Sequence, residues 1–156
     1  TENRMIKEKL FDEAKDPKKV YMTPKPKETV PYLNFSSLEN AMVILKEKAE
    51  EFQKIYSSGL QMPVAKQNEL NDLLYKAERS LIEPNGLPRR PWYKHEIYAP
   101  GFYTGYGVKT LPAIREAIEQ RNWKEAQEGI NTVSKTVQLY NTQVQQAVNL
   151  LGKPTF

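Results

Sequence analysis

Hydroxyl and cationic side chains that could hold an anion gather in one stretch of the chain, residues 84–112. They are Tyr98, Tyr103, Tyr106 and Lys109, with Arg89 and Arg90 ahead of them. Phenolic, ammonium and guanidinium groups bind carboxylates and phosphates through charge-assisted hydrogen bonds. Gly105 and Gly107 would let the backbone approach a ligand closely. The alternative is that these aromatic residues only pack the stretch onto the rest of the protein.

The composition excludes several other kinds of site. The chain has no cysteine, and His95 is its only histidine. Zinc prefers cysteine and histidine ligands, so we expect no metal site within this chain. A nucleophilic serine or threonine would need His95 as its base, and no serine lies in an elbow-like context. The sequence therefore predicts no catalytic residue of its own, and a structural role for His95.

The charge distribution argues against nucleic acid and membranes as partners. The net charge is +4, and residues 84–112 carry three of these four charges. No helix shows a basic face, which a module that reads a DNA groove would need. No apolar run approaches the roughly 20 residues of a membrane span. We expect neither nucleic-acid binding nor membrane contact.

Residues 84–112 themselves should form a long loop. They hold five of the eleven prolines and four of the seven glycines. No helix survives that density of proline and glycine. Helical periodicity flanks the stretch on both sides. We therefore predict an all-α protein, a bundle of about four helices, with this Pro/Gly/aromatic loop between the second and third main helices.

The first two main helices should span residues 37–58 and 63–82. Ser36 and Glu39 have the spacing of a capping box at the first helix. Its apolar seam steps by three and four residues along Leu38, Met42, Leu45, Ala49, Phe52 and Tyr56. Because only a short link joins these helices, we expect them to be antiparallel neighbours.

A short helix over residues 110–120 and a long one over residues 123–151 should follow. Asn122 and Glu125 form a second capping-box pattern before the long helix. One face of that helix is small or neutral, at Gly129, Thr132, Thr136, Leu139 and Gln143. Such a face either packs within the bundle or meets a partner, since interface cores are depleted in charge. The sequence leaves both alternatives open.

Residues 1–34 should be a connecting arm, and residues 35–156 the helical domain. A short helix over about residues 3–14 is the only regular element expected in the arm, because four prolines and several lysines follow it. The chain opens at Thr1 without an initiator methionine or a signal segment, as an excised piece of a longer protein would.

The centre of the loop resembles a known family. The residues that carry the resemblance are Gly86, Leu87, Pro88, Arg90, Pro91, Trp92, Tyr93, Lys94, His95, Ile97, Tyr98, Ala99 and Pro100. They are similar to the signature of the C-terminal helical domain of the glutamate carboxypeptidase II (prostate-specific membrane antigen) family of zinc peptidases. The transferrin receptor shares that type of domain.

The resemblance implies a helical bundle that mediates homodimerisation. In such chains this domain follows a dizinc peptidase domain and an apical domain, and its central loop helps to close the peptidase pocket. The two zinc ions and the catalytic residues belong to the peptidase domain, so this piece alone would be inactive. The resemblance also implies an extracytoplasmic location. The transferrin receptor supplies the alternative, a dimerisation module of a non-catalytic receptor or scaffold.

The resemblance also suggests substrate-binding residues. In the family, a Lys-Tyr pair of this loop holds the side-chain carboxylate of the substrate's terminal glutamate. Aligned without gaps, the tyrosine falls on Tyr106 and the lysine on Gly105, so half of the pair is present. Lys109 could reach the same space, and Tyr103 lies nearby. The expected ligand is a peptide with an acidic C-terminal residue, gripped by Tyr106, Lys109 and Tyr103 around Gly105.

Overall fold

The computed structural model describes residues 2–14, 16–19 and 22–152, and these divide into two compact units. The first is Thr1–Tyr32 and the second is Leu33–Phe156. Within the described ranges the chain is mostly helical, which confirms the predicted mainly-α class. None of the helices in these ranges combines the length and apolarity needed to cross a membrane.

The first unit contains two short helices, α1 (Glu2–Lys7) and α2 (Leu10–Glu13). The single helix expected over residues 3–14 is interrupted at Lys9, whose φ of 57° is left-handed. Neither helix buries a residue. The side chain of Asn3 exchanges two hydrogen bonds with the backbone of Lys27, at 2.5 and 2.9 Å. None of the described residues of this unit is buried, and these polar contacts join α1 to the segment around Lys27.

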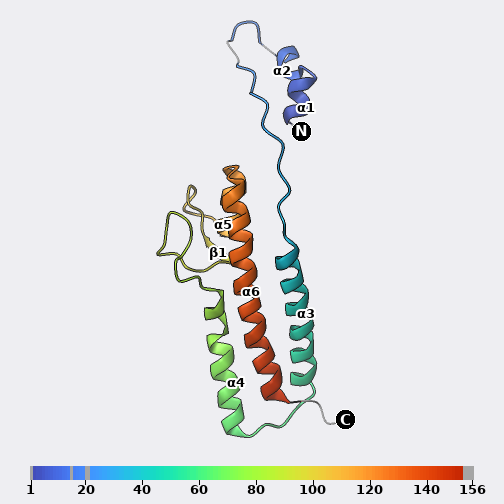
Figure 1. Cartoon of the computed structure of the whole chain (residues 1–156), viewed down its shortest axis with the longest axis vertical. Helices are drawn as coiled ribbons and strands as arrows, with labels where there is room; N and C mark the ends of the chain where they lie inside the picture. Colours follow the sequence, from blue (N-terminus) through green and yellow to red (C-terminus); the bar gives the residue numbers. More distant parts are fainter. Residues whose placement is uncertain (1, 15, 20–21, 153–156) are drawn as a thin grey trace. The chain divides into compact units, whose positions relative to one another are not determined.

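The second unit is built on its last helix, α6 (Trp123–Leu151). Three other helices pack against it, α3 (Ser36–Tyr56), α4 (Val64–Ala77) and α5 (Pro112–Glu119). A 3₁₀ turn, η1 (Glu78–Leu81), continues α4. Figure 1 shows α6 between α3 and α4. The predicted direct pairing of the first two helices is wrong, because both pack chiefly on α6.

The upper core joins α3, α5 and α6. Its buried members are Leu38, Ala41, Ile114, Ile130, Val133 and Val137. A Cβ on Gly129 would lie 3.3 Å from the backbone of Ala113 and Ile114, so this glycine permits the close approach of α5. Thr136 is also buried, whereas Leu139 is 57% exposed. The neutral face of α6 is thus inside the unit at Gly129 and Thr136, and open at Leu139.

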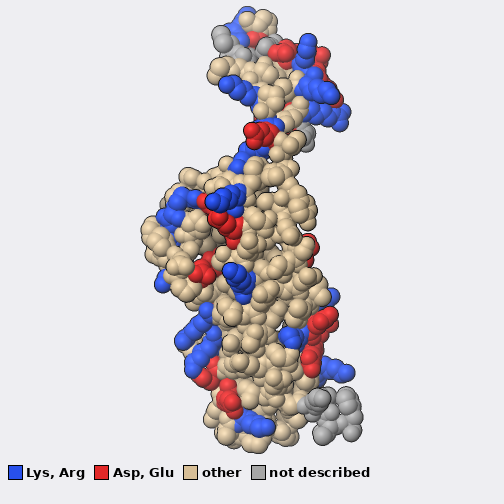
Figure 2. Space-filling model, viewed as in Figure 1, with Lys and Arg blue, Asp and Glu red and all other residues tan. Residues whose placement is uncertain are grey.

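A second cluster closes the other end of the unit. Its buried members are Ile55, Leu70, Ala147, Val148 and Leu151. The predicted seam of α3 is divided here: Leu45 and Phe52 pack toward α6, while Met42, Ala49 and Tyr56 are exposed. Figure 2 shows a broad uncharged area over the packed helices, with charged side chains around it.

The two capping predictions have different outcomes. Ser36 is the first helical residue rather than the cap, and its N–H donates to Asn34 Oδ1 at 3.0 Å. Asn122 does cap α6, since its Oδ1 accepts the N–H of Glu125 at 3.3 Å. The Glu125 carboxylate does not complete a capping box, because the Asn122 N–H donates to the Ala117 carbonyl at 2.8 Å.

Candidate functional site

The predicted loop contains a small β-hairpin that presents its tip. Strands β1 (Tyr98–Pro100) and β2 (Val108–Thr110) pair antiparallel, with Ala99 opposite Lys109. At the base of the loop, the N–H of Glu96 donates to the Leu81 carbonyl at 3.0 Å, which ties the loop to η1. The strands were not predicted, because each is only three residues long and β1 ends in a proline.

A buried ion pair holds the hairpin on α5. Arg90 and Glu116 are each 3% exposed, and Arg90 Nη2 lies 2.7 Å from both carboxylate oxygens. Arg90 Nη1 also donates to the Pro100 carbonyl, and the N–H of Phe102 donates to Glu116 Oε1 at 2.8 Å. Three of these four bonds end on the Glu116 carboxylate, so Glu116 holds the backbone at Phe102, where the hairpin tip begins.

Arg89 ties the same loop to α6. Its two terminal nitrogens each lie 2.8 Å from an oxygen of Glu125. This hydrogen bonding raises the pKa of Arg89 above its ordinary value. Both arginines of the loop are therefore paired with carboxylates of the domain itself. The sequence analysis proposed that they help to bind an anion, whereas in the structure they anchor the loop to α5 and α6.

His95 and Tyr98 are also engaged within the domain. His95 Nδ1 accepts from the N–H groups of Ile97 and Tyr98, at 3.2 and 3.4 Å, which leaves the proton on Nε2. The Tyr98 hydroxyl donates to Glu78 Oε1 at 2.8 Å, and this bond raises the pKa of Tyr98. The geometry supports the structural interpretation of His95.

Three of the four predicted substrate-binding residues lie at the tip of the hairpin. Tyr106 is fully exposed and Tyr103 is 67% exposed. Gly105 has a φ of +61°, and a Cβ there would meet nothing within 4 Å. The Gly105 N–H donates to the Gly101 carbonyl at 3.1 Å and forms the turn. The tip therefore presents two exposed tyrosine side chains, and the space beside Gly105 is open.

Lys109 lies away from the tip, at the paired base of the hairpin. Its ammonium group pairs with Glu119 of α5, and its side chain is 15% exposed. The hydrogen bond from Lys109 lowers the pKa of Glu119 below its ordinary value. To reach a ligand beside Tyr106, Lys109 would have to leave Glu119.

Two buried carboxylates were missed by the sequence analysis, Glu96 and Glu116. Glu96 is 1% exposed, and burial, with a contribution from Glu83, raises its pKa to about 7. Its Oε2 has no hydrogen-bond partner among the described residues. No local signal could have revealed either residue, because glutamate is ordinarily a surface residue. Nowhere in the described ranges do three or more acidic or histidine side chains form a metal-binding group.

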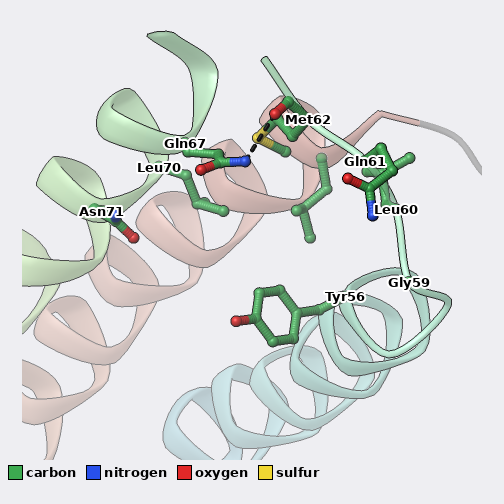
Figure 3. Close-up of a pocket in the computed structure, with 9 residues that line it drawn as sticks. Tyr56, Gly59, Leu60, Gln61, Met62, Gln67, Leu70 and Asn71 are labelled. Atoms are coloured by element: carbon green, nitrogen blue, oxygen red, sulfur yellow. Dashed lines mark hydrogen bonds between the residues drawn. The ribbon is translucent and has the colours of Figure 1, made fainter. Parts of the chain in front are cut away.

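A cavity of about 490 Å³ lies at the opposite end of the unit, where α3 and α4 are linked. Its apolar lining comes from Tyr56, Leu60, Met62, Leu70 and Leu151. Figure 3 shows the Tyr56 ring extending into it, and the Gln67 side chain donating to the Met62 carbonyl at 2.7 Å. Sequence patterns could not reveal this cavity, because Leu151 of α6 lines it together with residues 56–71, which lie far earlier in the chain.

Comparison with known proteins matches residues 33–145 to the transferrin receptor-like dimerisation domain. The chain is 42% identical over 79 residues to the probable glutamate carboxypeptidase LAMP1 of Arabidopsis thaliana, covering 46% of this chain and 12% of that protein. It is 31% identical over 104 residues to a probable glutamate carboxypeptidase of Arthroderma benhamiae, covering 67% of this chain and 13% of that protein.

An inactive zinc metalloprotease of Schizosaccharomyces pombe is 27% identical over 104 residues, covering 64% of this chain and 13% of that protein. The chain thus spans about an eighth of the length of these relatives. The family match covers well over half of the chain and nearly all of the packed helical unit. The chain belongs to the transferrin receptor-like dimerisation domain family, in the form found in glutamate carboxypeptidase-like proteins.

Proposed function

We propose that this domain completes the substrate pocket of a glutamate carboxypeptidase-like dizinc peptidase. The observation that carries the proposal is the fully exposed side chain of Tyr106 at the tip of an anchored hairpin. An exposed tyrosine on a mobile loop would lose conformational freedom on binding a ligand. Here the buried Arg90–Glu116 pair holds the base of the tip beforehand, so the tip is a prepared contact surface.

The reaction itself belongs to a peptidase domain outside this chain. The described residues offer no group of three metal ligands, so both zinc ions would be bound by that other domain. Zinc activates water and polarises the scissile carbonyl in such enzymes. The part of this chain is to bind and orient the substrate. On its own the chain has no hydrolytic activity.

The ligand we propose is a peptide whose C-terminal residue is acidic. The exposure of Tyr106 and Tyr103 supports this ligand, because their hydroxyl groups would donate hydrogen bonds to a carboxylate that reaches the hairpin tip. Lys109 adds positive charge by exchanging Glu119 for the carboxylate of the ligand. Gly105 occupies the position at which the resemblance places a lysine. The acidic side chain of the ligand would therefore bind more weakly than in a pocket with the complete Lys-Tyr pair.

Replacing Tyr106 by phenylalanine tests this role in the peptidase that carries the domain. The change removes one hydroxyl and keeps the ring, so we expect kcat/KM for a peptide ending in glutamate to fall about tenfold, as one lost hydrogen bond to a charged group would cause. Hydrolysis of a peptide ending in glutamine should change less. Tyr75→Phe is the matched control, because Tyr75 is 75% exposed on α4. Equal kinetics for the Tyr106 variant and the wild type would remove Tyr106 from the pocket.

One comparison favours a second function, a dimerisation module in a non-catalytic protein. The relative from Schizosaccharomyces pombe is described as an inactive zinc metalloprotease. A full-length protein that binds no zinc and hydrolyses no acidic dipeptide, while still forming dimers, would support this alternative. In either case we propose an extracytoplasmic location for the domain.

A further inference from the structure

A second cavity, of about 290 Å³, lies between residues 83–96 and the first turns of α6. Four glutamates line it: Glu83 and Glu96 come from the loop side, and Glu125 and Glu128 from α6. The other lining residues are small, apolar or neutral: Asn85, Gly86, Pro88, Ala113, Gly129 and Thr132. We call this cavity the acidic pocket.

Glu96 forms the buried part of the acidic pocket. It is 1% exposed, whereas the side chain of Glu128 is 64% exposed. The pocket therefore extends from the surface at Glu128 to an interior carboxylate. The Oε2 atom of Glu96 has no hydrogen-bond partner among the described residues. Because buried polar atoms in folded proteins nearly always have a partner, this oxygen indicates a donor from outside the domain.

The pocket also carries negative charge that the domain does not balance. Glu125 pairs with Arg89 at 2.8 Å, and Glu128 lies 3.9 Å from the exposed Lys124. Among the ion pairs of the described residues, none involves Glu83 or Glu96. Burial, with a contribution from the charge of Glu83, raises the pKa of Glu96 to about 7. The two unpaired carboxylates therefore lie close enough to repel each other, and a cation between them would stabilise both.

We propose that the acidic pocket binds the guanidinium group of an arginine side chain from outside this domain. Among the described residues, no three acidic side chains come together closely enough to hold one metal ion. A guanidinium group is larger and planar, and its five N–H donors can reach carboxylates that lie apart. The cavity, at about 290 Å³, has room for it.

The lining favours arginine over lysine. A guanidinium group is more weakly hydrated than an ammonium group, and its faces pack against uncharged surface. Gly86, Ala113 and Gly129 supply such surface between the carboxylates. Glu96 and Glu83 would accept the N–H groups in the interior, and Glu128 would attract the cation at the mouth. The proposal does not depend on the substrate pocket and would survive the failure of that function.

The first test is a titration of the 156-residue chain with N-acetyl-arginine amide at pH 8, followed through the backbone amide signals in NMR spectra. We expect millimolar binding that shifts the signals of Glu96 and Thr132. Glu96→Gln keeps the shape of the side chain and removes its charge, so binding should weaken at least tenfold. Glu47→Gln is the matched control, because Glu47 is exposed on α3 and lies outside the pocket lining. The same spectra show whether both variants stay folded.

Matched ligands test the chemistry of the occupant. N-acetyl-citrulline amide has a neutral urea group of nearly the same shape, and N-acetyl-lysine amide carries its charge on an ammonium group. Both should bind more weakly than the arginine derivative. Equal binding of either ligand, binding unchanged by Glu96→Gln, or no binding at all would overturn the proposal. Tighter binding of calcium chloride at the same amides would assign the pocket to a metal ion instead.

The affinity should also depend on pH through Glu96. Because its pKa is about 7, the arginine derivative should bind several-fold more weakly at pH 6 than at pH 8. The other charged groups at the pocket are Glu83 on the loop side, Glu125 with its partner Arg89, and Glu128, while α5 contributes the uncharged Ala113. Glu96→Gln leaves all of these in place. A pH dependence that persists in this variant would contradict the role of Glu96.

A longer protein identifies the source of the arginine. The chain spans about an eighth of the length of its relatives. If the rest of the protein supplies the arginine, saturation-transfer difference NMR should detect binding of N-acetyl-arginine amide to the 156-residue chain and not to the full-length protein. Binding to both would mean that the arginine belongs to another molecule. Binding to neither would refute the proposal.

Discussion

Replacing Glu116 by alanine should lower the free energy of unfolding by about 3–5 kcal/mol, because it leaves Arg90 charged and buried without its partner. Both side chains are 3% exposed and joined by two bonds of 2.7 Å. Glu116 also accepts the N–H of Phe102. The loss should therefore exceed that of any surface ion pair in the domain.

Urea unfolding followed by circular dichroism at pH 7 measures this effect. Asp72→Ala is the control, because the Lys76–Asp72 pair has a similar distance, 2.6 Å, but lies in solvent; its loss should be at most about 1 kcal/mol. The double variant Arg90→Met/Glu116→Leu removes both charges, and should recover much of the stability. A loss below 1 kcal/mol for Glu116→Ala would show that the pair is not the anchor.

The same substitution tests whether the Arg90–Glu116 pair positions the hairpin tip, which is this chain's part of the proposed substrate pocket. If the Arg90–Glu116 pair holds the hairpin tip, the amides of Gly101 and Phe102 should exchange hydrogen faster in Glu116→Ala than in the wild type. The exchange rates of amides in the middle of α6 should rise much less. A general loss of stability would instead raise the exchange rates of the tip amides and the α6 amides by the same factor. The comparison separates the positioning of the tip from general stability.

The helices could be predicted from the sequence where local signals agree. The bounds of α6 are those predicted, because Asn122 caps its start and Gly152, with a φ of +82°, ends it. The sequence predicted which side chains of α3 form its apolar seam, but it did not predict that α6 is the helix that packs against them. Periodicity shows which side chains avoid water, and α6 covers Leu45 and Phe52 while Met42 remains exposed.

The candidate site was predictable only in part, for a physical reason. Glycine and proline show where the chain leaves the helix, so the loop that carries Gly105 and Tyr106 could be predicted; that these residues bind substrate stays a prediction from the family resemblance. The Arg90–Glu116 pair joins residues 26 positions apart, and no local pattern encodes such a contact. Lys109 was placed in the site by its proximity along the chain, and only the fold shows that it pairs with Glu119.

Glu96 should make the domain less stable as the pH rises toward 8. Its side chain is 1% exposed, and burial raises its pKa from 4.5 to about 7 in the folded state. Below pH 4.5 the carboxyl group is protonated whether the chain is folded or not, so its ionisation does not change the free energy of unfolding. Above pH 4.5 the carboxyl group ionises in the unfolded chain but keeps its proton in the folded one, so stability is lost between pH 4.5 and about 7 and levels off once both states are ionised. The full shift corresponds to about 3 kcal/mol at pH 8.

Glu96→Gln isolates this effect, because glutamine keeps the shape of the side chain and carries no charge. We expect the variant to be more stable than the wild type by about 1–3 kcal/mol at pH 8, the lower figure allowing for relaxation around the charge, and nearly equal to it at pH 4. Unfolding in urea across this range, compared as the difference between the two proteins, cancels the other titrating groups. A difference independent of pH would mean that Glu96 is not a buried charge.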